Sequence, residues 1–374
     1  MGRTFEFDGI RGIAAILIML AHIGILSGTP WVTSIVDLFF VISGFLITAN
    51  ILKNSQTPRF LSVFFVRRAL RIWPAYYVAL VVCLVLNRSL KWDFRPDAWP
   101  QYLTFTQNAQ AYMKWPLPQF SGMFQHTWTL AIEEQFYLLW PLLMFRAGRR
   151  GMYAITLTFA LLPPIARSFG YWPYLLLTRS DGLALGSLLS LLLRDGARVE
   201  RRLISYRVGF AIVGLFALFS PIFRASVGST QVGEALFTSR ASLTYFGLVG
   251  LVFCSRGHPW LALLRGKILC YMGTISYGLY LYHPLVFASL PALYKRYIMR
   301  KLGLNSTLLM DLVMLGICVV VAEASRRWLE GPVLKLKDRW SFKGADKGSI
   351  YRGPHLHSAP QGLSSTVPRA TEAD

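Results

Sequence analysis

Long apolar runs recur along most of this chain, and they constrain its fold more than any other feature. Runs of roughly 17 to 25 residues are long enough to cross about 30 Å of hydrocarbon as a helix. Nearly every run is flanked by Arg or Lys, and only 15% of all residues are charged, well below the usual share in soluble domains. The sequence therefore predicts a polytopic membrane protein built from α-helices.

Hydropathy predicts an all-α transmembrane bundle of about ten spans. The expected spans lie near residues 10–28, 32–52, 74–87, 127–145, 152–166, 180–194, 208–223, 241–254, 268–291 and 306–329. A basic stretch before the third of them, 58–73, is expected to lie in the membrane interface as a separate helix. Residues 1–340 should form one transmembrane domain, and the Gly-, Ser- and Pro-rich residues 341–374 should form a disordered cytoplasmic tail.

The formal net charge of +21 fits a membrane protein whose basic residues flank its spans. Lys and Arg are concentrated in short connections between apolar runs, most densely in 53–73, 146–151, 194–207 and 255–267. By the positive-inside rule these connections, and with them both termini, are expected on the cytoplasmic side, although a basic cluster at 295–301 opposes that orientation. The expected partner of the basic residues is the membrane lipid, and no nucleic acid is expected.

Ionisable side chains inside the predicted spans mark the expected site. Such groups cost a few kcal/mol in hydrocarbon, so they usually line cavities and pair with one another. At about 1.5 Å per residue, His22 reaches the outer half of the first span. Other spans bring further groups to a similar depth, namely Asp37, Glu133, Glu134, Arg179, Asp181, Tyr277, Tyr282 and His283. For any one of them alone, a purely structural role is the alternative.

These residues suit acyl transfer. An imidazole beside carboxylates can take the proton from a hydroxyl that attacks a thioester. On the expected cytoplasmic side, Arg67, Arg68 and Arg71 offer paired donors to the phosphates of a nucleotide-bearing acyl carrier. Binding of lipid headgroups is the alternative for these arginines.

Six segments resemble, in order, those of the integral-membrane acyltransferase family 3. They are FDGIRGIAAILIMLAH, FFVISGFLI, FVRRALRIWPAYY, HTWTLAIEEQFYLLWP, RSDGLALGSLL and ISYGLYLYHPL, and the resemblance covers most of residues 5–332. It implies a multi-pass protein of the bacterial inner membrane. It also implies transfer of an acyl group, most often acetyl, from cytoplasmic acyl-CoA to a hydroxyl of an envelope or exported glycan.

The resemblance also implies roles for individual residues. The catalytic positions of the family correspond here to Arg11, His22, Glu133 and Glu134. Its basic, donor-binding motif corresponds to Arg67, Arg68 and Arg71. We expect the acceptor to contact the remaining polar residues, which are Asp37, His126, Arg179, Asp181, Tyr277, Tyr282 and His283. Acetyl-CoA is the expected donor substrate, and no metal is expected.

A secondary transporter or flippase is the rival function, because buried His and Glu side chains can also relay protons. No inverted repeat is visible in the sequence, and the order of the six segments opposes this alternative. A non-catalytic scaffold is a further alternative. The sequence leaves open the acceptor, the acyl group beyond a preference for acetyl, the oligomeric state, and whether His22 acts as a base or carries the acyl group.

Overall fold

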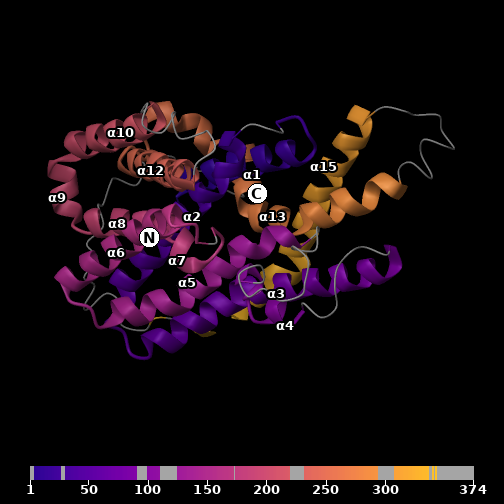
Figure 1. The fold of residues 1–374 in the computed structure, drawn as a ribbon, viewed down its shortest axis with the longest axis horizontal. Helices are drawn as coiled ribbons and strands as arrows, with labels where there is room; N and C mark the ends of the chain where they lie inside the picture. The colour runs from indigo at the N-terminus through magenta and orange to yellow at the C-terminus, as the bar shows by residue number, and fades with distance from the viewer. Residues whose placement is uncertain are drawn as a thin grey trace, which may run out of the picture.

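The computed structural model describes residues 4–26, 30–90, 99–109, 124–171, 173–219, 231–293, 307–336, 339–340 and 342. Every regular element within these ranges is a helix, so the all-α prediction is confirmed (Figure 1). The expected tail, 341–374, lies outside the described residues apart from Phe342.

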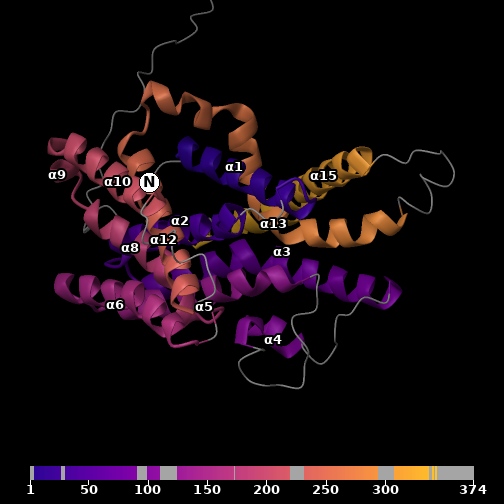
Figure 2. The ribbon, with the colours of Figure 1, turned by 45° about the horizontal axis from the view of Figure 1, so that its top comes forward.

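Ten longer helices make up most of the described part of the chain. They are α1 (Phe5–His22), α2 (Pro30–Asn54), α3 (Phe60–Leu90), α5 (Trp128–Phe145), α6 (Arg149–Ser168), α8 (Asp181–Leu192), α10 (Leu203–Phe219), α12 (Gln231–Cys254), α13 (Lys267–Leu293) and α15 (Thr307–Ala324). Shorter helices connect or extend them: α4 (Trp99–Leu103), η2 (Gln107–Ala109), η3 (Gln125–Thr127), α7 (Leu176–Arg179), α9 (Gly196–Arg201), η5 (Pro259–Arg265), the π-helical η7 (Ser325–Glu330) and α16 (Gly331–Leu336). The helices α10 and α12 pair at one end of the bundle and α13 and α15 at the other, while α3 and α5 run along the lower side in both views (Figures 1 and 2).

The outer surface of the bundle fits lipid rather than water. Large apolar side chains are exposed on many of its helices, among them Val85, Leu138, Leu161, Phe216 and Val320. Exposed apolar faces of this extent mark contact with a membrane or a partner. Four stretches in the described residues are long and apolar enough to span a membrane, namely Ser34–Asn54, Phe60–Leu86, Ala235–Cys254 and Leu308–Leu336. The total of about ten spans stays a prediction.

The basic stretch before the third expected span is not a separate interfacial helix. Residues 60–90 form one continuous helix, which passes through Pro74 and packs against the bundle with one face. Proline removes a backbone donor from a helix, but neighbouring side chains can satisfy carbonyl groups near it. Here the Tyr277 hydroxyl donates to the Ile72 carbonyl at 2.8 Å. Three arginines of this stretch, Arg67, Arg68 and Arg71, line a cavity in the bundle.

Glycines allow α1 and α13 to cross with their backbones in contact. A Cβ atom on Gly12 would lie 2.1 Å from the Leu269 carbonyl oxygen, and one on Gly273 would lie 1.9 Å from the Asp8 carbonyl oxygen. No other residue type fits at these positions without separating the helices. The helices α2 and α8 cross in the same way, at Gly44. Several glycines of the six sequence segments thus mark helix crossings.

The first turn of α1 is also anchored by a charge. Glu6 accepts hydrogen bonds from the Gly257 N–H at 2.9 Å and from the Arg265 guanidinium at 3.2 Å. Burial alone would raise the pKa of the Glu6 carboxyl, but these hydrogen bonds outweigh it and lower the pKa. The ionised form of Glu6 is therefore the one that stabilises the fold.

We expect Gly12→Ala to disrupt the bundle, because the added methyl group overlaps the backbone of α13. Overpacking of this kind costs about 1–3 kcal/mol or more. The matched control is Gly209→Ala on α10, where an added Cβ meets nothing within 4 Å. Thermal unfolding in detergent should show a lower midpoint for Gly12→Ala only. Equal midpoints for the two variants would contradict the crossing.

Glu6→Gln should destabilise the protein in a way that depends on pH. The folded-state pKa of Glu6 lies below its unfolded value, so its stabilisation is present above about pH 4 and is lost as the pH falls through the folded pKa. The difference in unfolding midpoint between wild type and variant should be large at pH 7 and shrink below pH 4. A difference that grows on acidification would be inconsistent with this anchor.

Candidate active site

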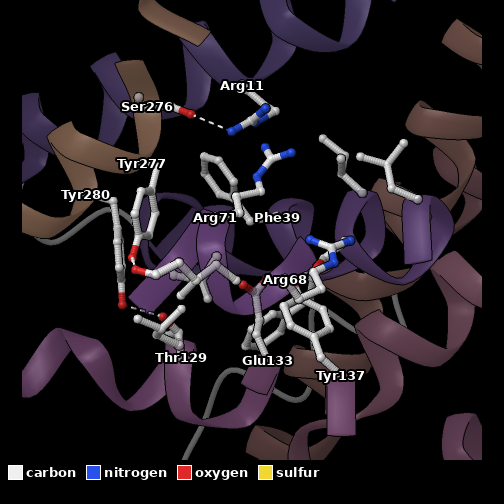
Figure 3. Close-up of a pocket in the computed structure, with 18 of the residues that line it drawn as sticks. Arg11, Phe39, Arg68, Arg71, Thr129, Glu133, Tyr137, Ser276, Tyr277 and Tyr280 are labelled. Atoms are coloured by element: carbon white, nitrogen blue, oxygen red, sulfur yellow. Dashed lines mark hydrogen bonds between the residues drawn. The ribbon is translucent and has the colours of Figure 1, made fainter. Parts of the chain in front are cut away.

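One cavity of about 700 Å³ runs through the bundle between α1, α2, α3, α5 and α13 (Figure 3). Residues of α2 line it from Val36 to Asn54. At 1.5 Å per residue this stretch of helix is about 27 Å long, close to the thickness of the hydrocarbon core. The cavity therefore extends over a depth comparable to that of a membrane.

One end of the cavity is strongly basic. Lys53, Arg67, Arg68 and Arg71 all line the cavity from this end toward its middle. The Arg68 guanidinium lies 4.6 Å from the centre of the Tyr137 ring. Arg67 donates to the Trp340 carbonyl at 2.6 Å, so the residues after α16 reach this end of the cavity. Several guanidinium groups close together form a site for an anion with more than one charge.

The middle of the cavity combines cations with one carboxylate. Arg11 and Arg71 extend into the same space from α1 and α3, and Glu133 lies beside Arg68 (Figure 3). Arg11 donates to the Ser276 hydroxyl at 2.9 Å, which ties α1 to α13 at this level. Such fixed donors can stabilise negative charge that develops on a reacting oxygen.

Two adjacent glutamates of α5 have different surroundings. Glu133 lines the cavity. Glu134 does not, because neighbouring residues point about 100° apart on a helix. Its carboxylate accepts a hydrogen bond from the Trp73 indole at 2.9 Å. Of the two glutamates, Glu133 is therefore the one whose side chain faces the cavity.

The other end of the cavity carries imidazole and hydroxyl groups. His283 of α13 lines it, together with Tyr280 and Thr129, whose hydroxyls lie 2.9 Å apart. The ring of His126 is 5.4 Å from that of His283, and the ring of His22 is 4.7 Å from it. Three helical segments thus bring three histidines together. Two of them, His22 and His283, were expected at a similar depth in the membrane.

His22 itself lies at the edge of this group. Its side chain is exposed, and its Nδ1 atom is 2.8 Å from the Ile18 carbonyl oxygen. It does not line the cavity, and the described residues place no carboxylate in hydrogen-bonding distance of it. The expected pairing of His22 with a glutamate is therefore not formed in the described part of the chain.

The remaining candidates lie beside the cavity. Asp37 accepts a hydrogen bond from Arg179 at 3.1 Å, with a second N–O contact of this ion pair at 2.9 Å, and another hydrogen bond from Ser242 at 3.2 Å. Asp181 accepts from Arg167 at 2.8 Å. All four ionic side chains are buried, so they join α2, α6, α7 and α8 from within. Arg167 was not among the expected residues.

Two tyrosines expected in the site differ in position. Tyr277 lines the cavity, whereas Tyr282 lies outside it and bonds to the Ser325 hydroxyl at 3.2 Å. Residues that line the cavity but were not predicted include Ser43, Thr129, Tyr137, Ser276 and Tyr280. Helical spacing was an available signal, since Thr129, Glu133 and Tyr137 are four residues apart and share one face of α5.

Comparison with known proteins shows which family this chain belongs to. The family described as "Acyltransferase domain" matches residues 5–323. The chain belongs to this acyltransferase family. Its exposed apolar surface and its four helices long enough to span a membrane are features of a membrane protein.

Similar proteins have been named in several bacteria. Peptidoglycan O-acetyltransferase OatA of Listeria monocytogenes is 27% identical over 373 residues, which cover 91% of this chain and 57% of that protein. A putative O-acetyltransferase of Staphylococcus aureus is 26% identical, covering 88% of this chain and 57% of that protein. The putative peptidoglycan O-acetyltransferase YrhL of Bacillus subtilis is 27% identical, covering 87% and 54%. The chain thus spans little more than half the length of these relatives, and no solved structure matches it.

We predict a structural role for the ion pair of Asp37 and Arg179. Arg179→Ala leaves the buried Asp37 carboxylate without its cation, which costs about 3–5 kcal/mol for a buried pair. The unfolding midpoint should fall strongly, while the same measurement on Glu200→Gln, at an exposed position of α9, should show little change. An unchanged midpoint for Arg179→Ala, with weaker acceptor binding, would instead support substrate contact.

Proposed function

We propose that this chain is an O-acetyltransferase that moves an acetyl group from acyl-CoA to a hydroxyl of peptidoglycan or another envelope glycan. One observation carries the proposal: a single cavity joins an arginine-rich end to an imidazole end across the bundle. The donor carries phosphates and the acceptor carries a hydroxyl, so the two ends match the two substrates. The names of the relatives support acetyl and peptidoglycan as the group and the acceptor.

The donor binds at the basic end in this proposal. Arg67, Arg68 and Arg71 hold the phosphates of acyl-CoA by charge-assisted hydrogen bonds. Lys53, at the end of α2, adds a further cation. The basic end faces the cytoplasm, as the distribution of Lys and Arg indicates, and the thioester arm extends along the cavity toward α13.

Transfer takes place in the middle of the cavity. The carbonyl oxygen of the thioester gains negative charge during attack, and Arg11 is fixed by Ser276 where it can stabilise that charge. Glu133 balances the cations and orients the reacting groups. The acceptor enters from the imidazole end, where His22 and its neighbours promote attack by its hydroxyl.

The purified chain in lipid nanodiscs tests this function with acetyl-CoA and peptidoglycan fragments. We expect release of free CoA that depends on the acceptor, and mass spectrometry should show acetylated fragments. A transporter would release no CoA. Binding of acetyl-CoA with no acetylation of any glycan fragment would contradict the acceptor class, and absence of binding would contradict the function.

Arg68→Gln should weaken donor binding. A hydrogen bond to a charged group contributes about 1.5–3 kcal/mol, so KM for acetyl-CoA should rise by about 10- to 100-fold with a smaller change in kcat. Arg201→Gln, on the exposed helix α9, is the matched control and should leave KM unchanged. Equal KM values for the two variants would rule out the arginine-rich end as the donor site.

Replacing each of the adjacent glutamates should separate their roles. Glu133→Gln removes the only carboxylate that lines the described cavity, and we expect kcat to fall by about 100-fold or more. Glu134→Gln retains a group that accepts from the Trp73 indole, so its loss should be less than about tenfold. The reverse order of effects in a steady-state assay would place the chemistry on the other side of α5.

A further inference from the structure

Tyr137 joins three helices at the point where the basic end of the cavity meets its middle. It belongs to α5, lines the cavity and is 5% exposed. The guanidinium carbon of Arg68, on α3, lies 4.6 Å from the centre of its ring. Its hydroxyl shares a hydrogen bond with the Ser43 hydroxyl of α2. The side chain therefore contacts one neighbour through its ring and another through its oxygen.

The Glu133 carboxylate belongs to the same group. Glu133 precedes Tyr137 by four residues, so the two side chains share one face of α5. The carboxylate interacts with the hydroxyls of Tyr137 and Ser43, and the positive charge of Arg68 acts on it as well. Glu133, Tyr137 and Arg68 lie together on one wall of the cavity (Figure 3). One tyrosine thus contacts both a cation of the basic end and the carboxylate of the middle.

The packing of α2 places Ser43 beside Tyr137. A Cβ atom on Gly44 would lie 1.9 Å from a backbone oxygen of α8, so this residue faces α8. Ser43, one residue earlier, points about 100° away and lines the cavity. Further along the same two helices, the Trp140 indole of α5 donates to the Thr48 hydroxyl of α2 at 2.8 Å, outside the cavity. Because this second bond also joins α2 and α5, the helices should stay paired without the Tyr137 hydroxyl.

We propose that Tyr137 is a positioning residue that links donor binding to acyl transfer: its ring holds Arg68, and its hydroxyl, together with that of Ser43, holds Glu133. This inference rests on the proposed acetyltransferase function and adds a residue to its machinery. A cation is attracted by the face of an aromatic ring and does not need the hydroxyl. A carboxylate needs the hydroxyl as a hydrogen-bond donor. The ring therefore serves donor binding and the hydroxyl serves the transfer step, while Tyr137 itself contacts neither substrate.

Substitutions that keep or remove the ring separate the two steps in steady-state kinetics. Tyr137→Phe keeps the ring and removes the hydroxyl, so kcat should fall by about tenfold or more while KM for acetyl-CoA stays within about twofold. Ser43→Ala should have the same effect, because it removes the other hydroxyl beside Glu133. Tyr137→Leu removes ring and hydroxyl together, so a similar fall in kcat should come with a rise in KM of about 3- to 30-fold.

A control variant and a double variant show whether the hydroxyl acts through the carboxylate. Tyr153→Phe on α6 removes a hydroxyl that donates to the Leu191 carbonyl at 3.2 Å, outside the cavity, and should leave kcat and KM unchanged. In the Glu133→Gln background, adding Tyr137→Phe should lower kcat by less than about twofold, because residues that act through one group do not lose activity additively. If Tyr137→Leu does not fold, Tyr137→Met, with a more adaptable apolar side chain, takes its place.

Three results would overturn the inference. The first is a kcat for Tyr137→Phe equal to that of Tyr153→Phe, and the second is a KM for Tyr137→Phe as high as that of Tyr137→Leu. The third is a double variant in which the losses of Glu133→Gln and Tyr137→Phe multiply. A wild-type protein that binds acetyl-CoA but acetylates nothing would overturn the proposed function itself. In that case Kd for acetyl-CoA still tests the ring, since Tyr137→Leu should bind more weakly than Tyr137→Phe.

Discussion

The contact between the backbones of α1 and α13 is the constraint on which the rest of the site depends. Glycine at positions 12 and 273 lets the two helices touch, and Glu6 fixes the register at one end of α1. With that register, Arg11 meets Ser276 in the middle of the cavity. Further along the same pair of helices, the His22 ring meets that of His283. One helix crossing thus positions both the Arg11 guanidinium and a pair of imidazole rings.

The cavity separates two kinds of chemistry along its length. Cationic side chains gather at one end, and imidazole and hydroxyl groups gather at the other. Buried ion pairs, such as that of Asp37 with Arg179, lie beside the cavity and join the helices around it. The arginines of α3 therefore line the cavity, whereas Asp37 and Arg179 are paired and buried beside it.

Much of this arrangement was predictable from the sequence. Hydropathy indicated an all-α membrane bundle, and the order of six segments indicated the acyltransferase family. Depth along the helices was enough to bring His283 and Glu133 to the cavity. Rotation about each helix axis was harder to predict, because it depends on which faces pack together. That is why Glu134, Tyr282, Asp37 and His22 lie outside the cavity, although the sequence grouped them with the residues that line it. The continuation of α3 through Pro74 likewise required knowledge of its neighbours.

An experimental map of the chain in lipid, bound to a hydrolysis-resistant acetyl-CoA analogue, tests the central claim most directly. The account predicts phosphate density beside the arginines of α3 and the acyl end of the analogue in the middle of the cavity, beside Arg11 and Glu133. Phosphate density at the imidazole end, or an analogue bound outside the bundle with lipid filling the cavity, would contradict it.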